Sequence, residues 1–250
     1  MINENKKSIK VLSPISACIL AVGIVAAAAV IMQGLVNFRG SERYVTVKGL
    51  AMKDVEANIA SWSIKHVVTG NDLSALQVTI EANSGLIEKF LLNHGVPKDT
   101  KFFKTVDVQD RFALTYGQEA PVDQRYIVSE TITVQTDKLD AVEGAYQDVG
   151  ELIKKGVSIV KEGQEGSGNP IYIFTRLNEI KPEMIHAATI NARSSAEQFA
   201  KDSGAEVGAI KQANQGVFQM LPRHSDEMYL EKFARYKTIR VVSTIKFYLK

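Results

Sequence analysis

A long uncharged stretch near the start of this 250-residue chain constrains what it can form more than any other feature. No acidic or basic residue lies between Lys10 and Arg39. Residues 11–38 are mostly apolar, and about 20 such residues suffice for a helix to cross a bilayer. Pro14 suits the entrance of such a helix, where a missing backbone N–H costs little. We therefore predict a transmembrane signal anchor over residues 11–38.

Three uses of this stretch stay open. An uncleaved signal anchor is favoured, because apolar residues continue to Val36. A cleavable signal peptide is the second, since Ala26, Ala27 and Ala28 supply the small residues that a signal peptidase requires. A lipoprotein signal is the third, because residues 15–18, Ile-Ser-Ala-Cys, resemble a lipobox.

The flanking charges predict the orientation of the anchor. Three lysines precede it, and two arginines, Arg39 and Arg43, follow it. Basic residues favour the cytoplasmic side of a membrane. We therefore expect a single-pass inner-membrane protein, with residues 1–10 as a cytoplasmic tail and residues 41–250 exported to the periplasm.

The composition argues against several kinds of partner. With 30 Lys and Arg against 28 Asp and Glu, the net charge is +2, so no general positive charge holds a nucleic acid. The single cysteine, Cys18, excludes an intrachain disulfide and a zinc site of several thiolates. It also leaves the exported part without a thiol nucleophile.

Period-two alternation predicts strands in the exported part. Residues 238–249 alternate between apolar and mostly polar side chains, which is typical of a strand with one solvated face. Residues 128–135 repeat the pattern. Two further strands are expected at residues 45–48 and 57–68.

Apolar residues at spacings near 3.6 predict three helices, at residues 71–93, 139–155 and 182–203. Ser74 and Gln77 form a candidate capping box for the first of these helices.

The third expected helix has clear ends and one face of mostly small residues. Pro182 is placed in its first turn, and Gly204 is its expected terminator. The small residues allow close packing against a sheet. The expected inner face consists of Ile185, Ala188, Ala192, Ser195 and Phe199.

The expected order is strand, strand, helix, strand, strand, helix, strand, helix, strand, strand. Consecutive strands joined by short turns pair antiparallel. The order therefore predicts an α+β fold of mostly antiparallel sheets with packed helices, preceded by the transmembrane helix. The glycine-rich loop at residues 161–170 is a candidate hinge between two subdomains.

The third expected helix also carries a motif that resembles the signature of the SIMPL-domain family. In that signature an Ala-Arg dipeptide is followed by Ala-Glu, a helix-ending glycine and a Val/Leu-Gly pair. Residues 45–49, 92–97 and 238–249 resemble the family's opening strand, a helix end and its closing strand, so the similarity covers about residues 43–250. The motif residues here are Gly49, Ala192, Arg193, Ala196, Glu197, Gly204, Val207 and Gly208.

The resemblance implies an exported or membrane-attached α+β protein that binds copies of itself. Some bacterial members of the family form large ring-shaped homo-oligomers, and some are linked to oxidative-stress defence. No catalytic residues are agreed for the family. The long anchor and Lys48 before Gly49 depart from the usual pattern.

Histidine and charged residues in the exported part favour structural roles. His66 shares an expected strand face with Trp62, which favours a hydrogen-bonded imidazole in a core or interface. His94 suits the negative end of a helix dipole. Residues 224–227, His-Ser-Asp-Glu, offer three metal-binding side chains but no further ligand that the sequence shows.

Motifs of nucleophilic catalysis and phosphate binding are missing. The sequence has no G-x-S-x-G motif, and the glycines of residues 161–170 lack the Gly-Lys-Ser/Thr of a phosphate loop. Arg193 and Glu197, four residues apart, are expected to pair on a helix surface. We therefore expect a protein that is not an enzyme and has no catalytic residue, cofactor or metal.

The expected function is that of a structural or interaction module. The predicted protein is anchored in the bilayer through residues 11–38, self-assembles into a large homo-oligomeric ring or cage, and serves envelope or oxidative-stress defence. One alternative is an envelope enzyme or small-ligand-binding protein with a pocket between its subdomains. Another is a scaffold for a partner membrane protein complex. No nucleic-acid partner is expected.

Overall fold

The computed structural model describes residues 14–38, 43–114, 123–161 and 168–250. The predicted cytoplasmic tail, and most of the candidate hinge in the glycine-rich loop, lie outside the described residues.

Contacts within the chain divide it into two compact units, which are described separately. Unit 1 comprises Met1–Thr46, Ala196–Gln212 and Lys246–Lys250. Unit 2 comprises Val47–Ser195 and Ala213–Ile245.

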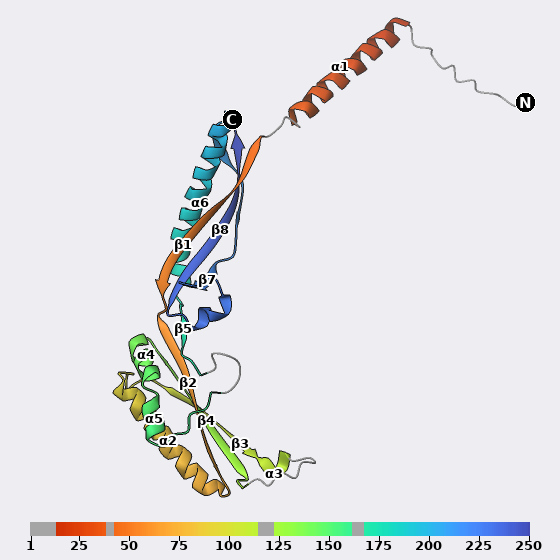
Figure 1. Ribbon diagram of the computed structural model, residues 1–250. Helices are drawn as coiled ribbons and strands as arrows, with labels where there is room; N and C mark the ends of the chain where they lie inside the picture. The colour runs from red at the N-terminus through yellow and green to blue at the C-terminus, as the bar shows by residue number, and fades with distance from the viewer. Residues whose placement is uncertain (1–13, 39–42, 115–122, 162–167) are drawn as a thin grey trace, which may run out of the picture. The chain divides into compact units, whose positions relative to one another are not determined.

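The first described element is the helix α1 (Pro14–Phe38), which falls inside the predicted anchor segment (Figure 1). Its large apolar side chains, including Ile19, Val22 and Val25, are mostly exposed. Among the residues that the structure describes, no helix meets both the length and the hydropathy of a membrane span. The transmembrane anchor therefore stays a prediction.

Unit 2 contains a four-stranded antiparallel sheet in the order β3-β4-β2-β5. The alternation expected around residues 128–135 is present, because Val128, Ile132 and Val134 are buried. The strands are β2 (Ile59–Gly70), β3 (Phe102–Asp110), β4 (Tyr126–Thr136) and β5 (Ile171–Ile173).

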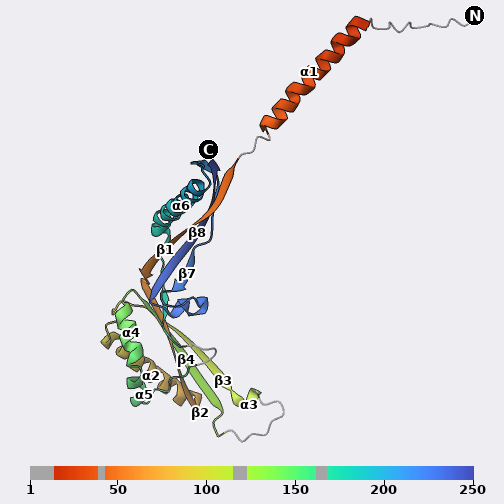
Figure 2. The same ribbon diagram turned by 45° about the horizontal axis from the view of Figure 1, so that its top comes forward.

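Three helices, α2 (Leu73–Asn93), α4 (Leu139–Gln147) and α5 (Gly150–Lys154), lie along one face of this sheet (Figures 1 and 2). The predicted single helix over residues 139–155 is thus two helices, because the first ends at Asp148. A hydrophobic core fills the space between helices and sheet. Its largest members include Trp62, Ile64, Ile87, Phe90, Leu91, Ile132 and Leu152.

The N-terminus of α2 differs from its predicted capping box. The N-cap is Asp72, whose carboxylate accepts a hydrogen bond of 2.9 Å from the backbone N–H of Ser74. Ser74 and Gln77 lie inside the helix, so the predicted box is wrong. An ionised carboxylate at the N-cap also interacts favourably with the helix dipole.

A second sheet has the order β1-β8-β6, and β7 also pairs with β8. In unit 1 the N–H of Leu249 donates to the carbonyl of Arg43, and in unit 2 the N–H of Ala57 donates to the carbonyl of Arg235. The strands are β1 (Tyr44–Glu56), β6 (Val207–Gln215), β7 (Gln219–Pro222) and β8 (Tyr236–Leu249), with short helices α3 (Arg111–Leu114) and η1 (Met228–Phe233) elsewhere in the chain.

The helix α6 (Leu177–Asp202) starts earlier than predicted, so Pro182 lies inside it rather than in its first turn. Its inner face also differs. Phe199 is 60% exposed, so its predicted inward position is wrong. The buried residues recur every four positions, as Met184, Ala188, Ala192, Ala196 and Ala200.

The described residues thus form an α+β fold of antiparallel sheets with packed helices, which confirms the predicted fold class. The observed order also contains the short strand β7 and the one-turn helices, which the sequence patterns did not predict.

Candidate functional sites

A very close contact between the helix α6 and the strand β1 in unit 2 lies at a family-motif residue. An added Cβ on Gly49 of β1 would lie 1.8 Å from the carbonyl oxygen of Ala188 and 2.6 Å from the backbone nitrogen of Ala192. Only glycine leaves space for the helix backbone at this distance. Beside it, the side-chain amide of Asn191 donates to the carbonyl of Leu50 at 2.7 Å. Gly49 and Ala192 therefore have a packing role.

The other motif residues occupy the end of α6 and the start of β6. Ala196 is buried, whereas Arg193 and Glu197 are exposed on the same helix. Gly204 has a φ of 65°, the left-handed conformation that ends many helices. Gly208 lies close to Tyr248, because an added Cβ would be 3.1 Å from its carbonyl oxygen. The motif thus marks helix packing and helix termination.

A buried polar pair lies in the sheet of unit 2. His66 of β2 faces Glu130 of β4 across the strands, with 2.9 Å between His66 Nε2 and Glu130 Oε2. His66 is completely buried, which lowers the pKa of its imidazole; hydrogen bonding to Glu130 opposes this effect. The predicted hydrogen-bonded core imidazole is confirmed.

Two contacts fix the position of the helix α2 along the sheet. Glu88 of α2 pairs with Lys104 of β3 at 2.5 Å. Leu76, near the start of α2, lies beside Gly70 at the end of β2, which shows that α2 runs antiparallel to β2. Ser84 precedes Glu88 by one helical turn, which is about the spacing between alternate residues of a strand. This register places Ser84 over the row that contains His66.

Within the described residues, two buried side-chain polar atoms lack a hydrogen-bond partner, namely Ser84 Oγ and His66 Nδ1. Buried polar atoms are usually paired. The structure shows no hydrogen bond between Ser84 and His66, and both buried atoms stay without a partner.

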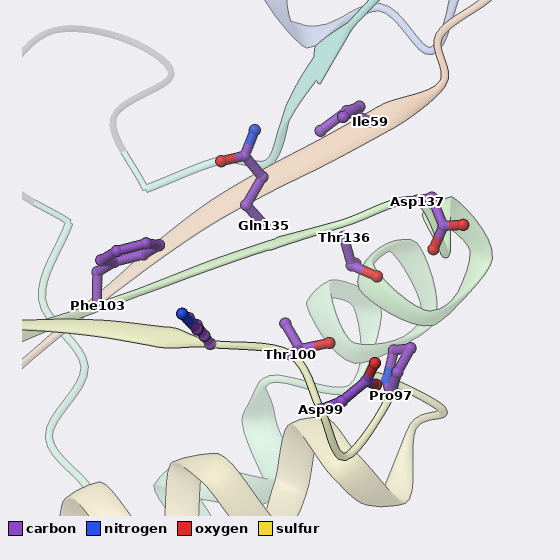
Figure 3. Close-up of a pocket in the computed structure, with 9 residues that line it drawn as sticks. Ile59, Pro97, Asp99, Thr100, Phe103, Gln135, Thr136 and Asp137 are labelled. Atoms are coloured by element: carbon purple, nitrogen blue, oxygen red, sulfur yellow. The ribbon is translucent and has the colours of Figure 1, made fainter.

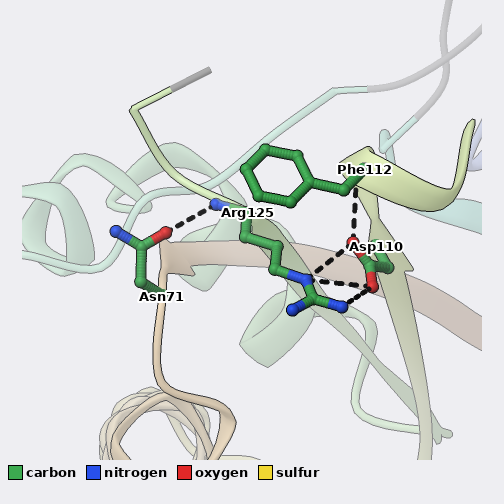
Figure 4. A network of polar contacts seen from close by, with 4 residues as sticks. All are labelled: Asn71, Asp110, Phe112 and Arg125. Atoms are coloured by element: carbon green, nitrogen blue, oxygen red, sulfur yellow. Dashed lines mark hydrogen bonds and ion pairs between the residues drawn. The ribbon is translucent and has the colours of Figure 1, made fainter. Parts of the chain in front are cut away.

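A polar network joins the end of β3 to the residue before β4 (Figure 4). Arg125 donates to both carboxylate oxygens of Asp110, at distances of 2.7 to 3.1 Å, and its guanidinium lowers the pKa of that carboxyl. The N–H of Phe112 donates to Asp110, and the N–H of Arg125 donates to Asn71. Sequence reasoning missed this network, although opposite charges on either side of a Gly- and Pro-containing loop were the available signal.

A second network surrounds Arg235, which precedes β8. Its guanidinium contacts Glu56 at 2.7 Å and Asp140 and Glu143 at 2.6 Å each. Three carboxylates raise the pKa of Arg235, although its burial acts in the opposite direction. The guanidinium therefore holds β1 and α4 together. A cavity of about 540 Å³ lies beside it, and Arg176, Asp137 and Lys138 also line it.

Another pocket, of about 400 Å³, opens where the loop before β3 approaches the ends of β2 and β4 (Figure 3). Its lining combines two carboxylates and the ammonium group of Lys101 with hydroxyl, amide and apolar groups, so it offers polar binding groups. The labelled residues are Ile59, Pro97, Asp99, Thr100, Phe103, Gln135, Thr136 and Asp137.

The structure brings together only part of the candidate metal-binding group at residues 224–227, and it places His94 at a helix end. His224 and Asp226 line one pocket of about 320 Å³, but Glu227 is not part of its lining. No group of three metal-binding side chains is present in the part of the chain that the structure describes. His94 is held at a helix end, with Nδ1 at 2.9 Å from the carbonyl oxygen of Phe90 and Nε2 at 3.2 Å from Asp148.

The edge strand β3 exposes apolar side chains. It pairs with β4 on one side, and no described strand pairs with its other side. Phe103, Val106 and Val108 are each about half-exposed or more. Long edge strands with apolar side chains and free backbone groups favour pairing with another chain.

The described fold and these packing motifs define a two-sheet α+β protein whose motif glycines and alanines serve close helix packing. The model of the SIMPL family, described as "Protein of unknown function (DUF541)", matches residues 45–244. The chain belongs to the SIMPL family, as the sequence motif predicted.

Two further comparisons add little. No curated protein matches the chain. A crystal structure of an uncharacterized conserved protein from Listeria innocua has 13% sequence identity, with 80% of this chain and 92% of that chain covered and a TM-score of 0.18. A TM-score this low does not show a shared fold.

Proposed function

We propose that this SIMPL-family protein is a membrane-anchored periplasmic module that assembles with copies of itself into a large ring or cage. The anchor is the segment over residues 11–38. Support comes from α1, whose apolar side chains, such as Val22 and Val25, are 69% exposed. Such a surface is unfavourable in water and is favourable in lipid.

Self-assembly is carried by one observation, the exposed edge of β3. Val106 and Val108 are 48% and 51% exposed on a nine-residue strand without proline. Lys104 is the single basic residue of the strand and forms an ion pair with Glu88. Its charge therefore does less to prevent the edge from pairing with another chain. A second copy of the chain is the proposed partner of this edge. The closed ring is what the family resemblance implies.

Native mass spectrometry of the detergent-solubilised chain tests the assembly. We expect a multiple of the protomer mass at micromolar concentration, and a smaller species for Val106→Lys, because a charge would be buried at the interface. Val78→Lys is the matched control, since Val78 is similarly exposed on α2 and away from the edge. A wild-type monomer at this concentration would contradict the proposal.

Protease protection tests the topology. In intact spheroplasts, added protease should digest the part after residue 41, because we place it outside the inner membrane. Digestion only after the membrane is broken would contradict this orientation.

A role in envelope or oxidative-stress defence is what the family resemblance implies, and a scaffold for a membrane protein complex is the alternative role. Co-purification in mild detergent would identify such a complex. A partner that binds the Val106→Lys variant equally well would show that scaffolding does not require assembly.

Small-ligand binding is the alternative that a specific cavity favours. Arg176 and Arg235 line the cavity of about 540 Å³, and guanidinium groups suit carboxylate ligands. A set of small carboxylates should then raise the melting temperature of the wild type but not that of Arg176→Gln. No rise in the wild type would exclude this alternative.

A further inference from the structure

A compact cluster of tyrosines and lysines lies in unit 1. Lys211 Nζ is 4.8 Å from the ring centre of Tyr44 and 5.2 Å from that of Tyr248. Lys246 Nζ is 5.7 Å from the ring centre of Tyr44. These four residues, here called the tyrosine–lysine cluster, come from the three strands β1, β6 and β8. Cation–π contacts thus place the ammonium group of Lys211 against both phenol rings and that of Lys246 against the ring of Tyr44.

The cluster lies on the face of β8 opposite the buried core. Phe247 is completely buried between Lys246 and Tyr248 in the sequence, so alternation points these two side chains to the other face. Tyr44 is about half-exposed. Gly208 beside Tyr248 adds no side chain to this surface. The cluster is therefore accessible from outside the unit.

The net charge around the cluster is positive. Residues 43–46, 196–212 and 246–250 of unit 1 contain five basic and three acidic residues. Two of the basic residues belong to the cluster, and two others, Arg43 and Lys250, lie at the sheet end, where Lys250 also pairs with Glu206 through backbone hydrogen bonds. There the N–H of Leu249 donates to the carbonyl of Arg43 at 2.8 Å.

The chain tethers this cluster to the anchor segment. Tyr44 follows the end of α1 at Phe38 by six residues, which span at most about 21 Å. If the anchor is in a bilayer, as proposed above, the cluster is within reach of the lipid surface. Tyrosine rings are enriched at both interfaces of a membrane, and anionic lipid headgroups attract basic side chains.

We propose that the tyrosine–lysine cluster binds the phosphate groups of anionic phospholipids, an inference that rests on the proposed membrane anchor. Lys211 and Lys246 supply the charge, and the two tyrosines supply the amphipathic rings. Each lysine near a negatively charged membrane contributes about fivefold to binding.

Lysine acetylation read by mass spectrometry tests the site on the full chain. The chain is placed in nanodiscs of phosphatidylcholine and in nanodiscs of equal parts phosphatidylcholine and phosphatidylglycerol. We expect Lys211 and Lys246 to react several-fold more slowly in the anionic discs. Lys98 and Lys154, both exposed in unit 2, are internal controls and should react equally in both discs.

Three outcomes would overturn the proposal. Equal reaction of Lys211 in the two discs would show that anionic lipid does not cover it. Equal protection of Lys98 would show general adsorption. Protection by inorganic phosphate in phosphatidylcholine discs would assign the cluster to a soluble anion.

Flotation separates failure of this site from failure of the anchor. The full chain should float with phosphatidylcholine vesicles after washing in alkaline carbonate if the segment over residues 11–38 is inserted. Flotation without lysine protection would contradict only the proposed lipid site. Loss of flotation would contradict both the proposed anchor and the lipid site.

Discussion

The imidazole of His66 and the carboxylate of Glu130 form a hydrogen bond of 2.9 Å between neighbouring strands, where both side chains are buried. Burial is the main cause of the lowered pKa of His66, and the nearby Lys104 acts in the same direction. Folding therefore disfavours protonation of this imidazole.

The first prediction is a loss of stability in acid. Well above pH 6.5 the imidazole is neutral in both folded and unfolded chains, so it adds no pH dependence. Below about pH 6.5 the unfolded chain binds a proton that the folded chain resists, so the free energy of unfolding falls by up to about 1.4 kcal/mol per pH unit. This fall continues down to the lowered pKa of folded His66. Urea denaturation at several pH values, followed by Trp62 fluorescence, measures it.

His66→Gln should remove this component, because an amide can donate to Glu130 without titrating. His186→Gln, which changes an exposed histidine, is the control and should retain the wild-type profile. An unchanged slope in His66→Gln would show that another group causes the acid sensitivity.

The second prediction concerns the unpaired hydroxyl of Ser84. Ser84→Ala should leave the free energy of unfolding unchanged or raise it by up to about 1 kcal/mol, because the change removes a buried hydroxyl that makes no hydrogen bond. Urea denaturation measures the difference between the two chains. A loss of about 1 kcal/mol would show that the hydroxyl has a hydrogen-bond partner in solution.

The third prediction concerns the close helix contact of β1. Gly49→Ala should cost at least about 3 kcal/mol, because the added methyl meets backbone atoms that cannot rotate away. Thermal unfolding followed by circular dichroism measures the change.

Gly85→Ala is the matched control for this substitution. Gly85 lies exposed in α2 with no heavy atom within 4 Å of an added Cβ. Replacing a helical glycine by alanine should stabilise the chain by about 0.5–1 kcal/mol. Equal effects of the two changes would contradict the close approach at Gly49.

The fourth prediction concerns Arg235. Arg235→Gln should destabilise the chain by about 1–3 kcal/mol, because Glu56, Asp140 and Glu143 lose their shared cation. Arg223→Gln is the control, since the Arg223–Asp54 pair is about half-exposed and such pairs contribute less than about 1 kcal/mol. Similar urea midpoints for both variants would show that the three-carboxylate network adds nothing beyond a surface pair.

Local patterns in the sequence were sufficient to predict most elements. The alternation of residues 238–249 corresponds to β8, and the small residues Ala188 and Ala192 do face the sheet. Phe199 was placed wrongly because the buried stripe recurs every four residues, which leaves a residue next to Ala200 pointing outward. Periodicity identifies a helix more reliably than it identifies the orientation of its large side chains.

The polar sites depend on strand register, which the sequence does not display. Asp110 and Arg125 meet only because β3 and β4 pair in one particular alignment. Gly49 was recognised as a motif residue, but its role required the position of the α6 backbone.

The central position of β8 has a consequence for biosynthesis. This strand is the last one described in the chain, yet it lies between β1 and β6. A ribosome therefore makes β1 long before its hydrogen-bonding partner exists. Only a product that includes residues 236–249 can complete this sheet, so β1 and β6 cannot take their observed places in it before translation has passed β8.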